Sequence, residues 1–532
     1  MSIRTLSGTV EDASASVCVI GAGMAGIVIA QRLVRAGLSV VVLESGGSSF
    51  DPTLDELNRI DDVFGTHDSA VTGRFRALGG SSIRWGGRLI PITGDEAGPR
   101  PYIGVPGWPF DTRELDRYRP EIEQLFGVDD SSYEEDVLEQ LDRSRLIPRN
   151  DLDFAARFPK WAPFRRCDLG AHTRQEFEKA PNVVVWLEAS VCGFEIDTES
   201  GRVKTALARS RAGSTLKVGA HEFVVAAGAI ETTRLLLLLD RHCGDRIFTS
   251  CDAVGRYLQE HLGAKVADLI PLERQRTNRF FGYRFIGSTR RSLHLQLTQS
   301  AQKADAVASA FAHATMVAEP TSTTDILRRA LRGLQAGRFD VTPREALDVI
   351  TDTGSLFRGV VWRYIRRQHY WPPDLGHQVN VWIEQLPSAA NRIFLSDRRD
   401  RFGVPLARVE WRPTEADERT FRACTSRLAA YWRRRQLGRF CELSWTLSPD
   451  DASVHFTREA AHLFHPSGST RMGTSPRESV VGPDLRSHHL ANLTVASASV
   501  FPTAGSTNPT LTLLQIAMRA ADSVARQVGA RT

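Results

Sequence analysis

The sequence lacks the features by which membrane-spanning, exported and metal-binding chains are usually recognised. No run of about 18 apolar residues occurs in it, so we expect no transmembrane segment. Residues 1–16 have no apolar core of signal-peptide length and include acidic residues early. The 7 cysteines form no CxxC pair and no zinc or haem-attachment spacing, so no metal site is expected. They fit reduced thiols in a cytoplasmic protein, although a disulfide between Cys243 and Cys251 stays open.

The sequence also lacks a concentration of charge of one sign. The net charge of +5 arises from 67 Lys and Arg against 62 Asp and Glu, and the basic residues are spread along the chain. We therefore expect no nucleic-acid partner. One arginine-rich stretch, at 326–367, could meet a membrane surface or an acidic partner, or could form the solvated faces of amphipathic helices. The length of 532 residues exceeds what one hydrophobic core supports, so we expect two domains.

A dinucleotide-binding pattern is present near the N-terminus. An apolar strand is predicted at 17–20, followed by GAGMAG at 21–26, a helix over 27–38 and a second strand at 38–43 that ends in Glu44. Gly21 allows the tight turn, Gly23 lets the backbone approach a pyrophosphate, and Gly26 lets helix and strand pack closely. The Glu44 carboxylate can accept hydrogen bonds from a ribose diol and would repel a 2′-phosphate. The pattern predicts an ADP-bearing cofactor without choosing between NAD and FAD.

A second glycine cluster, LGGSSIRWGG, follows at 78–87. Four glycines and two serines in such a loop can place backbone N–H groups around a phosphate or a flat ring. A flexible surface loop would also be rich in glycine, but Leu78, Ile83 and Trp85 favour partial burial. Two such cradles suit FAD, because this cofactor is long.

The C-terminal hundred residues hold the candidate catalytic groups. His465 lies in FHPSGSTRMG, a turn rich in glycine and hydroxyls, and a histidine is a suitable base for an alcohol proton. A histidine that only caps this turn is the alternative. Asn508 and Pro509 suit the N-cap and first position of a helix that runs to about residue 528. The N-terminus of that helix would stabilise negative charge on a reduced flavin.

The middle of the chain reads as strands and helices that return to the nucleotide-binding sheet and then form a second domain. Strands at 182–192 and 221–227 and a helix at 231–239 belong to the first group. Strands at 378–386, 392–396 and 407–411 predict an antiparallel sheet that would form a floor over the flavin. Trp371, Trp382 and Glu384 there would suit a sugar ring, although such tryptophans are more often core residues.

Several of these segments together resemble the glucose–methanol–choline (GMC) oxidoreductases. They are GAGMAG with VVVLESGG, the GGSSxxxWGG loop, GWPFDTRELDRY, the AAGA segment at 226–229, VGRYLQEH ending at His261, HPSGSTRMG, and NPTLT. The resemblance covers nearly the whole chain and is weak only at about 270–375. It is nearest to bacterial sugar dehydrogenases and to flavin oxidases of aminoglycoside pathways.

The resemblance implies an α/β fold with a Rossmann-like FAD-binding domain, residues 1–95, 180–265 and 455–532, interleaved with a substrate domain, residues 96–179 and 266–454, built on an antiparallel sheet with helices. Some relatives bond FAD to a histidine where this chain has Arg84, so non-covalent FAD is implied. His465 corresponds to the catalytic histidine and Asn508 to its partner. The residues assigned to the cofactor are Gly21, Gly23, Met24, Ala25, Gly26, Glu44, Ser45, Gly79, Gly80, Ser81, Ser82, Trp85, Gly86, Gly87, Val191, Ala227, Gly228, Ser497, Ala498, Asn508, Pro509 and Thr510.

The implied activity is FAD-dependent oxidation of an alcohol to a carbonyl compound, with a sugar or sugar-derived alcohol as substrate and oxygen or another carrier as electron acceptor. Ser497 stands where many members have aspartate, which leaves open how this turn contacts the cofactor. A flavoprotein of another class is one alternative, but no second GxGxxG is present for a pyridine nucleotide. A non-catalytic FAD-binding subunit is another, and the presence of both His465 and Asn508 argues against it.

Overall fold

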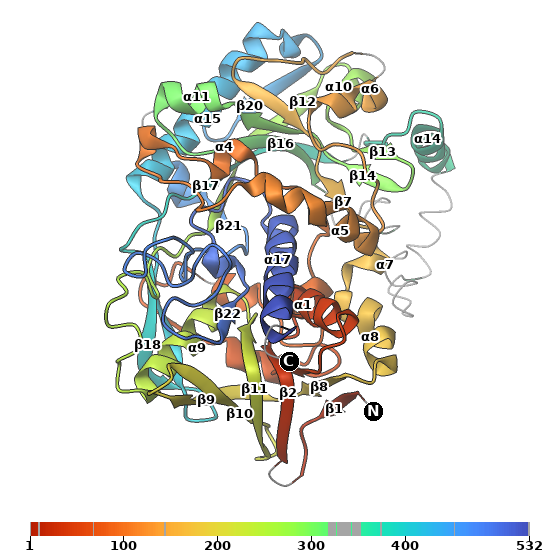
Figure 1. Ribbon diagram of the computed structural model, residues 1–532. Helices are drawn as coiled ribbons and strands as arrows, with labels where there is room; N and C mark the ends of the chain where they lie inside the picture. Colours follow the sequence, from red (N-terminus) through yellow and green to blue (C-terminus); the bar gives the residue numbers. More distant parts are fainter. Residues whose placement is uncertain are drawn as a thin grey trace.

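The computed structural model describes residues 2–8, 11–67, 69–142, 145–317, 326, 342, 353–372, 375–451 and 453–529. Two large β-sheets organise these residues, one in the lower and one in the upper half of Figure 1. Strands of the two sheets alternate along the chain, so each sheet is assembled from segments that are far apart in the sequence.

The lower sheet has a parallel centre and an antiparallel edge. Its order is β1-β8-β3-β2-β11-β10-β9, with β22 also paired to β11, and only β10 runs antiparallel to its neighbours. The centre is buried on both faces, which explains its continuous runs of valine and isoleucine. The bounds are β1 (Ile3–Thr5), β2 (Glu11–Ile20), β3 (Val40–Leu43), β8 (Val183–Leu187), β9 (Ser190–Asp197), β10 (Arg202–Arg209), β11 (Thr215–Val225) and β22 (Leu493–Val495).

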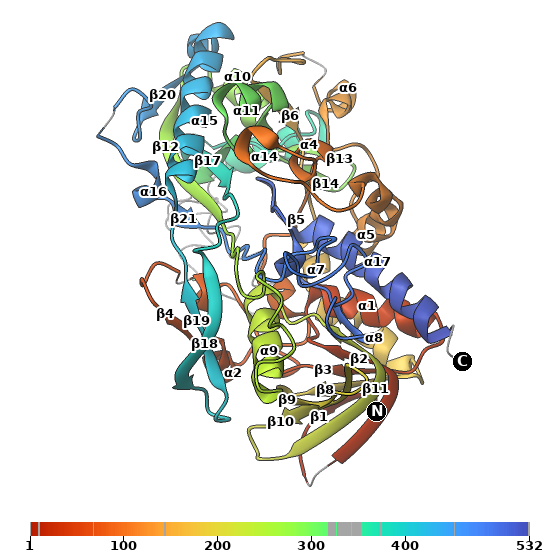
Figure 2. The ribbon, with the colours of Figure 1, turned by 60° about the vertical axis from the view of Figure 1, so that its left-hand side comes forward.

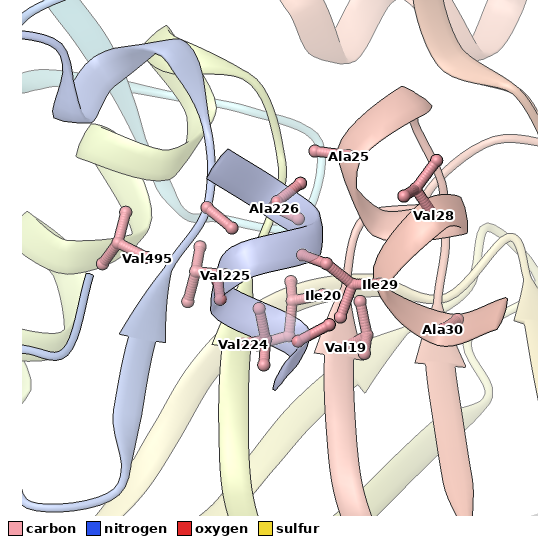
Figure 3. Close-up of a cluster of buried hydrophobic side chains, with 14 of the residues drawn as sticks. Val19, Ile20, Ala25, Val28, Ile29, Ala30, Val224, Val225, Ala226 and Val495 are labelled. Atoms are coloured by element: carbon pink, nitrogen blue, oxygen red, sulfur yellow. The ribbon is translucent and has the colours of Figure 1, made fainter. Parts of the chain in front are cut away.

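Helices α1 (Met24–Arg35), α9 (Ala229–His242) and α17 (Thr510–Gly529) cover this sheet. Helix α1 packs against α17 near the centre of Figure 1. Figure 3 shows Ile29 of α1 directed toward Val19 and Val225 of the central strands, and all three side chains have 0% exposure. Each such side chain contributes roughly 1.5–3 kcal/mol through burial. This core fixes the point where β2 turns into α1.

The upper sheet is antiparallel throughout. Its order is β20-β12-β17-β16-β15-β6, with β21 also paired to β12. Helix α15 (Glu415–Arg434) begins with a capping box and packs on β16 and β17, and its Phe421 and Leu428 join a second hydrophobic core. The bounds are β6 (Phe154–Arg157), β12 (His261–Pro271), β15 (His294–Leu297), β16 (Ala310–Val317), β17 (Gly376–Glu384), β20 (Cys441–Trp445) and β21 (Ala461–His462).

Two smaller sheets complete the described part. One contains β13 (Arg284–Ile286), β14 (Thr289–Arg291), β7 (Lys160–Trp161) and β5 (Arg88–Leu89). The other contains β18 (Arg392–Arg399), β19 (Pro405–Glu410) and β4 (Ile60–Asp62), on the left of Figure 2. The prediction that β17, β18 and β19 form one sheet is therefore wrong. After β17 the chain leaves the upper sheet, and β19 pairs in parallel with β4 instead.

Other predicted elements differ in extent. The strand predicted at 182–192 is two strands, because Glu188 has a positive φ of 54° that breaks the extended backbone. Most of the arginine-rich stretch lies outside the described residues, which include α14 (Thr353–Tyr364). The division into two domains stays a proposal. Further helices of at least seven residues are α5 (Arg119–Phe126), α8 (Leu169–Lys179), α10 (Arg274–Phe281) and α11 (Gln299–Asp305). Within the described ranges, no helix has both the length and the apolar character to cross a membrane.

Candidate active site

The turn between β2 and α1 can be made only with glycine at two positions. Gly21 has a positive φ of 102°, and a Cβ there would lie 2.7 Å from the Ala226 carbonyl oxygen. A Cβ on Gly26 would lie 1.9 Å from the Gly21 carbonyl oxygen. Gly23, by contrast, has no atom within 4 Å of where its Cβ would be, so its backbone faces open space. The first two glycines shape the turn, and the third leaves room for a ligand.

The second glycine loop lies directly against the first. The Gly79 N–H donates to the Ala22 carbonyl at 2.9 Å, and a Cβ on Gly80 would come within 2.8 Å of the Gly23 Cα. Two stretches that are more than fifty residues apart therefore form one continuous backbone surface. Backbone N–H groups at the start of α1 add the partial positive charge of a helix N-terminus to this surface.

Glu44 ties the end of β3 to the same surface. Its two carboxylate oxygens accept hydrogen bonds from the Ala22 N–H at 2.8 Å and the Gly46 N–H at 2.7 Å. Burial is the main influence on this carboxyl and raises its pKa, and the two backbone donors oppose that rise. The Oε1 atom also accepts from the Ser45 hydroxyl at 3.3 Å, whereas Oε2 keeps a second lone pair that can accept from a ligand hydroxyl.

A single cavity joins these loops to the candidate catalytic histidine. It is lined by Gly21, Gly23, Met24, Ala25, Glu44, Ser45, Gly80, Ser81, Val191, Ala227, Gly228, His465, Ser497, Ala498, Pro509 and Thr510, all of which the sequence singled out. Other predicted cofactor residues are not among the lining residues, namely Gly26, Gly79, Ser82, Trp85, Gly86, Gly87 and Asn508. Trp85 donates its indole N–H to the Cys167 carbonyl at 2.9 Å, and a Cβ on Gly87 would meet the Cys167 Sγ at 2.7 Å. These residues shape the loop.

Several lining residues were missed by the sequence reasoning. Arg76 is buried and pairs with Glu231 at 3.1 Å, while Arg234 pairs with both Glu231 and Asp400. Arg74 lines the same wall. The sequence shows these three arginines and two acids in separate segments, and nothing local indicated that they meet.

His465 and Asn508 lie together at one end of the cavity. The Asn508 Nδ2 is 3.2 Å from the His465 Nε2, and the Asn508 Oδ1 accepts from the Arg88 guanidinium at 3.4 Å. The prediction that Asn508 is the N-cap of α17 is wrong by one position. The first helical bond joins the Leu513 N–H to the Pro509 carbonyl, so Pro509 occupies the N-cap. The Asn508 amide is thereby free to bind side chains.

His261 fixes the protonation pattern of His465. The His261 Nε2 lies 2.6 Å from the Gly505 carbonyl, which can only accept, so this nitrogen carries the proton. Burial holds the pKa of His261 below its ordinary value, so the ring is neutral and its Nδ1 is an acceptor. The His465 Nδ1 lies 2.9 Å from that acceptor and therefore donates to it. Neutral His465 is left with a lone pair on Nε2, the nitrogen beside Asn508.

Charge and burial keep His465 neutral. Its pKa is held well below the ordinary value, first by burial and then by His261 and the Arg88 cation. The Asn508 amide orientation agrees with this state, because Nδ2 donates toward the Nε2 lone pair while Oδ1 accepts from Arg88. The arrangement presents an unprotonated imidazole nitrogen at the edge of the cavity, as general-base chemistry requires.

Glu260 positions the backbone of both histidines. Its carboxylate accepts from the His465 N–H at 2.8 and 2.9 Å and from the His261 N–H at 3.0 Å. The side chain is fully buried, and burial raises its pKa to about 8 against the opposing effect of these donors. The sequence offered one signal for Glu260 and His261, which is their place at the end of VGRYLQEH.

Two buried carboxylates hold the loop before α17. Glu96, in α4 (Gly94–Ala97), accepts from the Ser506 N–H at 2.8 Å. Glu384 accepts from the Gly505 N–H at 3.2 Å and forms an ion pair with Arg100 at 2.5 Å. Glu384 is thus occupied inside the protein and is no candidate for substrate hydroxyls.

Two further residues named from the sequence lie outside the catalytic group. Trp371 stacks on His377 with ring centroids 4.4 Å apart and belongs to the second core. His462, the alternative base, packs on Trp411 with ring centroids 4.6 Å apart. Of the aromatic residues proposed near the substrate, only Trp382 lies close to the pair, through Arg88.

Known proteins share both the sequence and this architecture. Residues 387–517 match the family described as GMC oxidoreductase, and residues 19–62 match the NAD(P)-binding Rossmann-like domain. The chain is therefore similar to the GMC oxidoreductases, and its residues 387–517 match their C-terminal domain. It is 25% identical over 96% of its length to 2-methyl-1,2-propanediol dehydrogenase of Mycolicibacterium austroafricanum, covering 95% of that protein. It is 24% identical over 97% of its length to 6'''-hydroxyparomomycin C oxidase of Streptomyces lividus, covering 92%.

A solved structure with the same fold is pyridoxine 4-oxidase from Mesorbium loti, with a TM-score of 0.59 and 17% identity over 96% of this chain and 98% of that one. The predicted fold class, a Rossmann-like domain combined with an antiparallel-sheet region, is confirmed for this chain.

The cavity fits FAD, the cofactor of the GMC oxidoreductases to which the chain is similar. A Cβ at Gly26 or Gly80 would close the backbone cradle, while the space beside Gly23 is open for a diphosphate. The lining then continues from Glu44 to His465, as a long two-ended cofactor requires. Arg84 is exposed, and its guanidinium lies 4.3 Å above the Phe50 ring, so residue 84 offers no nucleophile for a covalent bond.

Proposed function

We propose that this enzyme oxidises an alcohol CH–OH group to a carbonyl, with His465 as the base. The observation that carries the proposal is a neutral His465 with a lone pair on Nε2. His261 donates from its Nε2 to the Gly505 carbonyl and accepts at Nδ1 from the His465 Nδ1–H, which leaves the His465 Nε2 unprotonated. When bound, FAD supplies the acceptor for the hydride from the alcohol carbon. The enzyme's own residues supply the proton acceptor and the orientation of the alcohol.

His465 takes the hydroxyl proton on Nε2 and so becomes an imidazolium. The bond from its Nδ1–H to His261 then becomes charge-assisted and stronger, which favours proton transfer. Asn508 donates toward the same Nε2 before substrate arrives, and this weak 3.2 Å bond gives way to the alcohol O–H. We infer that the Asn508 amide then holds the alcohol oxygen.

The other predicted cofactor residues take supporting roles in the proposal. The glycine loops, with Gly21, Gly23 and Gly80, hold the diphosphate through backbone N–H groups. Glu44 accepts from the ribose hydroxyls. Ser497, which caps the turn Ala498–Val500 through the Ser499 N–H at 3.2 Å, shapes the backbone beside the cofactor. FAD is held without a covalent bond.

The proposed substrate is a sugar or a sugar-derived alcohol, such as an aminoglycoside intermediate, and the acceptor is oxygen or another carrier. Support comes from the names of the relatives, one a diol dehydrogenase and one an oxidase of a hydroxyparomomycin. Both are similar to this chain along nearly its whole length.

The test is anaerobic stopped-flow reduction of the enzyme by an alcohol that the parent oxidises. His465→Ala should retain FAD and reduce it about 10²–10⁴-fold more slowly, the usual contribution of a positioned base. His462→Ala is the matched control, since this histidine packs on Trp411 away from the pair, and it should leave the rate within about threefold. Equal rates for His465→Ala and the parent would refute the assignment.

A further inference from the structure

Arg88 places a buried positive charge beside the catalytic pair. It lies in β5, immediately after the second glycine loop, and is 8% exposed. Its guanidinium stacks between two tryptophans, 4.5 Å from the Trp161 ring and 4.9 Å from the Trp382 ring. Within the described residues, its guanidinium donates one hydrogen bond, to the Asn508 Oδ1 at 3.4 Å.

The other buried arginines show how unusual this is. Arg100 pairs with Glu384, Arg157 with Glu134, and Arg291 with Asp129, while Arg76 and Arg234 both pair with Glu231. Arg284 donates to three backbone carbonyls. Among the described residues, Arg88 is the one buried arginine that contacts neither a carboxylate nor a backbone carbonyl, and its Nε is buried without a partner.

The charge of Arg88 persists despite its burial. Burial lowers the pKa of its guanidinium to about 10, and Arg290 adds to the decrease while Tyr283 opposes it. The group is therefore still protonated at neutral pH. Its positive charge lowers the pKa of His465, His294 and His313, so it acts on all three of these buried histidines.

The described side chains around Arg88 include hydrogen-bond donors and aromatic rings but no carboxylate. His294 of β15 and His313 of β16 are fully or nearly fully buried, and both ring nitrogens of His294 and the Nδ1 of His313 have no hydrogen-bond partner. Trp382 of β17 lies 4.9 Å from His313. A neutral imidazole still carries one N–H, so His294 leaves a donor unused next to an uncompensated cation. Burying such a set without an acceptor is costly, and an anionic ligand would satisfy it.

We infer that the substrate is a hydroxy acid, whose carboxylate binds Arg88 while its carbinol faces His465. This rests on the proposed function and narrows its substrate class to sugar acids and related hydroxy acids. Asn508 connects the two groups, because one end of its amide contacts His465 and the other contacts Arg88. A carboxylate within a few atoms of the carbinol carbon would span that distance. An aminoglycoside intermediate is then excluded from the substrate class of the proposed function, since Arg88 would repel its ammonium groups.

The reaction leaves the carboxylate unchanged. The hydrogen of the carbinol C–H bond would pass with both bonding electrons, as hydride, to bound FAD, the O–H proton would pass to His465, and the C–O bond would become a carbonyl. The product is an oxo acid. Arg88 therefore acts in substrate selection and orientation, and its loss should affect anionic substrates much more than neutral ones.

The first measurement compares matched substrates that differ in charge. Galacturonate against galactose, and lactate against lactamide, are used in anaerobic reduction of the holoenzyme. The parent should favour the carboxylate of at least one pair, and Arg88→Met should lower its kcat/KM about 10- to 100-fold while changing the neutral member by less than threefold. Arg88→Lys, which keeps the charge, should retain much of the preference. Arg241→Met is the matched control, because Arg241 is exposed at the end of α9.

The second measurement needs no turnover and therefore separates failure of this inference from failure of the proposed function. Acetate is titrated into the oxidised holoenzyme, and the visible flavin spectrum is followed. The parent and Arg241→Met should show a saturable shift that Arg88→Met loses and Arg88→Lys retains. An absent shift in the parent, or an equal shift in Arg88→Met, would overturn the inference. Reduction by neither member of a pair would count against the proposed activity alone, since the acetate result stands independently.

Discussion

The two ends of the cavity are built in opposite ways. At the Glu44 end, the backbone of two glycine loops forms the surface, and each loop is a short continuous stretch of sequence. At the His465 end, side chains from β5, β12 and the segment before α17 form a chain of polar contacts. The first end depends on space for the main chain, and the second depends on proton positions and charge. Substitutions should therefore affect cofactor retention at one end and turnover at the other.

The largest effect is expected from substitutions at Gly26, which shapes the turn, and at Gly23, which faces the space for a ligand. Gly26→Ala places a methyl group 1.9 Å from the Gly21 carbonyl and should destabilise the protein by about 3 kcal/mol, with loss of FAD. Gly23→Ala meets no atom within 4 Å, so the apoprotein should keep its Tm while FAD affinity falls. Thermal melts of apo- and holoprotein check both. Equal stability of the two apo variants would mean that the turn tolerates a side chain.

At the other end, His261→Leu removes the acceptor for the His465 Nδ1–H and should slow flavin reduction about 10- to 100-fold without loss of FAD. His261→Gln is the matched rescue, because its amide can donate to Gly505 and accept from His465. With neutral His465 as the proposed base, the parent rate should stay flat with falling pH until well below 6.5, because the pKa of His465 is lowered. A merely structural role for His261 would leave this pH profile unchanged in the leucine variant.

The smallest effect concerns Glu260 and the pH dependence of stability. Burial raises its pKa from 4.5 to about 8, so between these values the folded protein binds a proton that the unfolded chain has released. This contribution therefore decreases stability as pH rises from about 4.5 to 8. Glu260→Gln lacks it, so the Tm of the variant relative to the parent should improve by a few degrees between pH 5 and 8. A constant difference across this range would show that Glu260 does not titrate there.

The sequence identified most residues that line the Glu44 end of the cavity, because the information for this end is local. The spacing of Gly21, Gly23 and Gly26 already requires a strand, a turn and a helix, and Glu44 follows at the end of the next strand. The catalytic end was predicted in part. His465 and Asn508 came from residue chemistry and family resemblance, whereas the contact between His261 and His465 joins residues 204 positions apart. No local pattern encodes such a pairing.

Arg88 shows the same limit from another side. Its segment reads as glycine followed by apolar residues, and one arginine there is unremarkable in a chain with 67 basic residues. The proposed role of Arg88 depends on the lack of a carboxylate beside it among the described residues, and only the folded structure shows this lack. The error over β17, β18 and β19 is similar, because alternation predicts strands but does not choose the partner strand.

The loop before α17 is clasped by carboxylates that belong to the opposite side of the molecule. Glu384 reaches it from the upper sheet and Glu96 from α4, and both are fully buried. If the two sheets separated, these carboxylates would lose their hydrogen bonds from the backbone while still largely shielded from water. The loop therefore links the two hydrophobic cores, and we expect them to unfold together in one cooperative transition. The distance between His465 and the two glycine loops then depends on the stability of the entire fold.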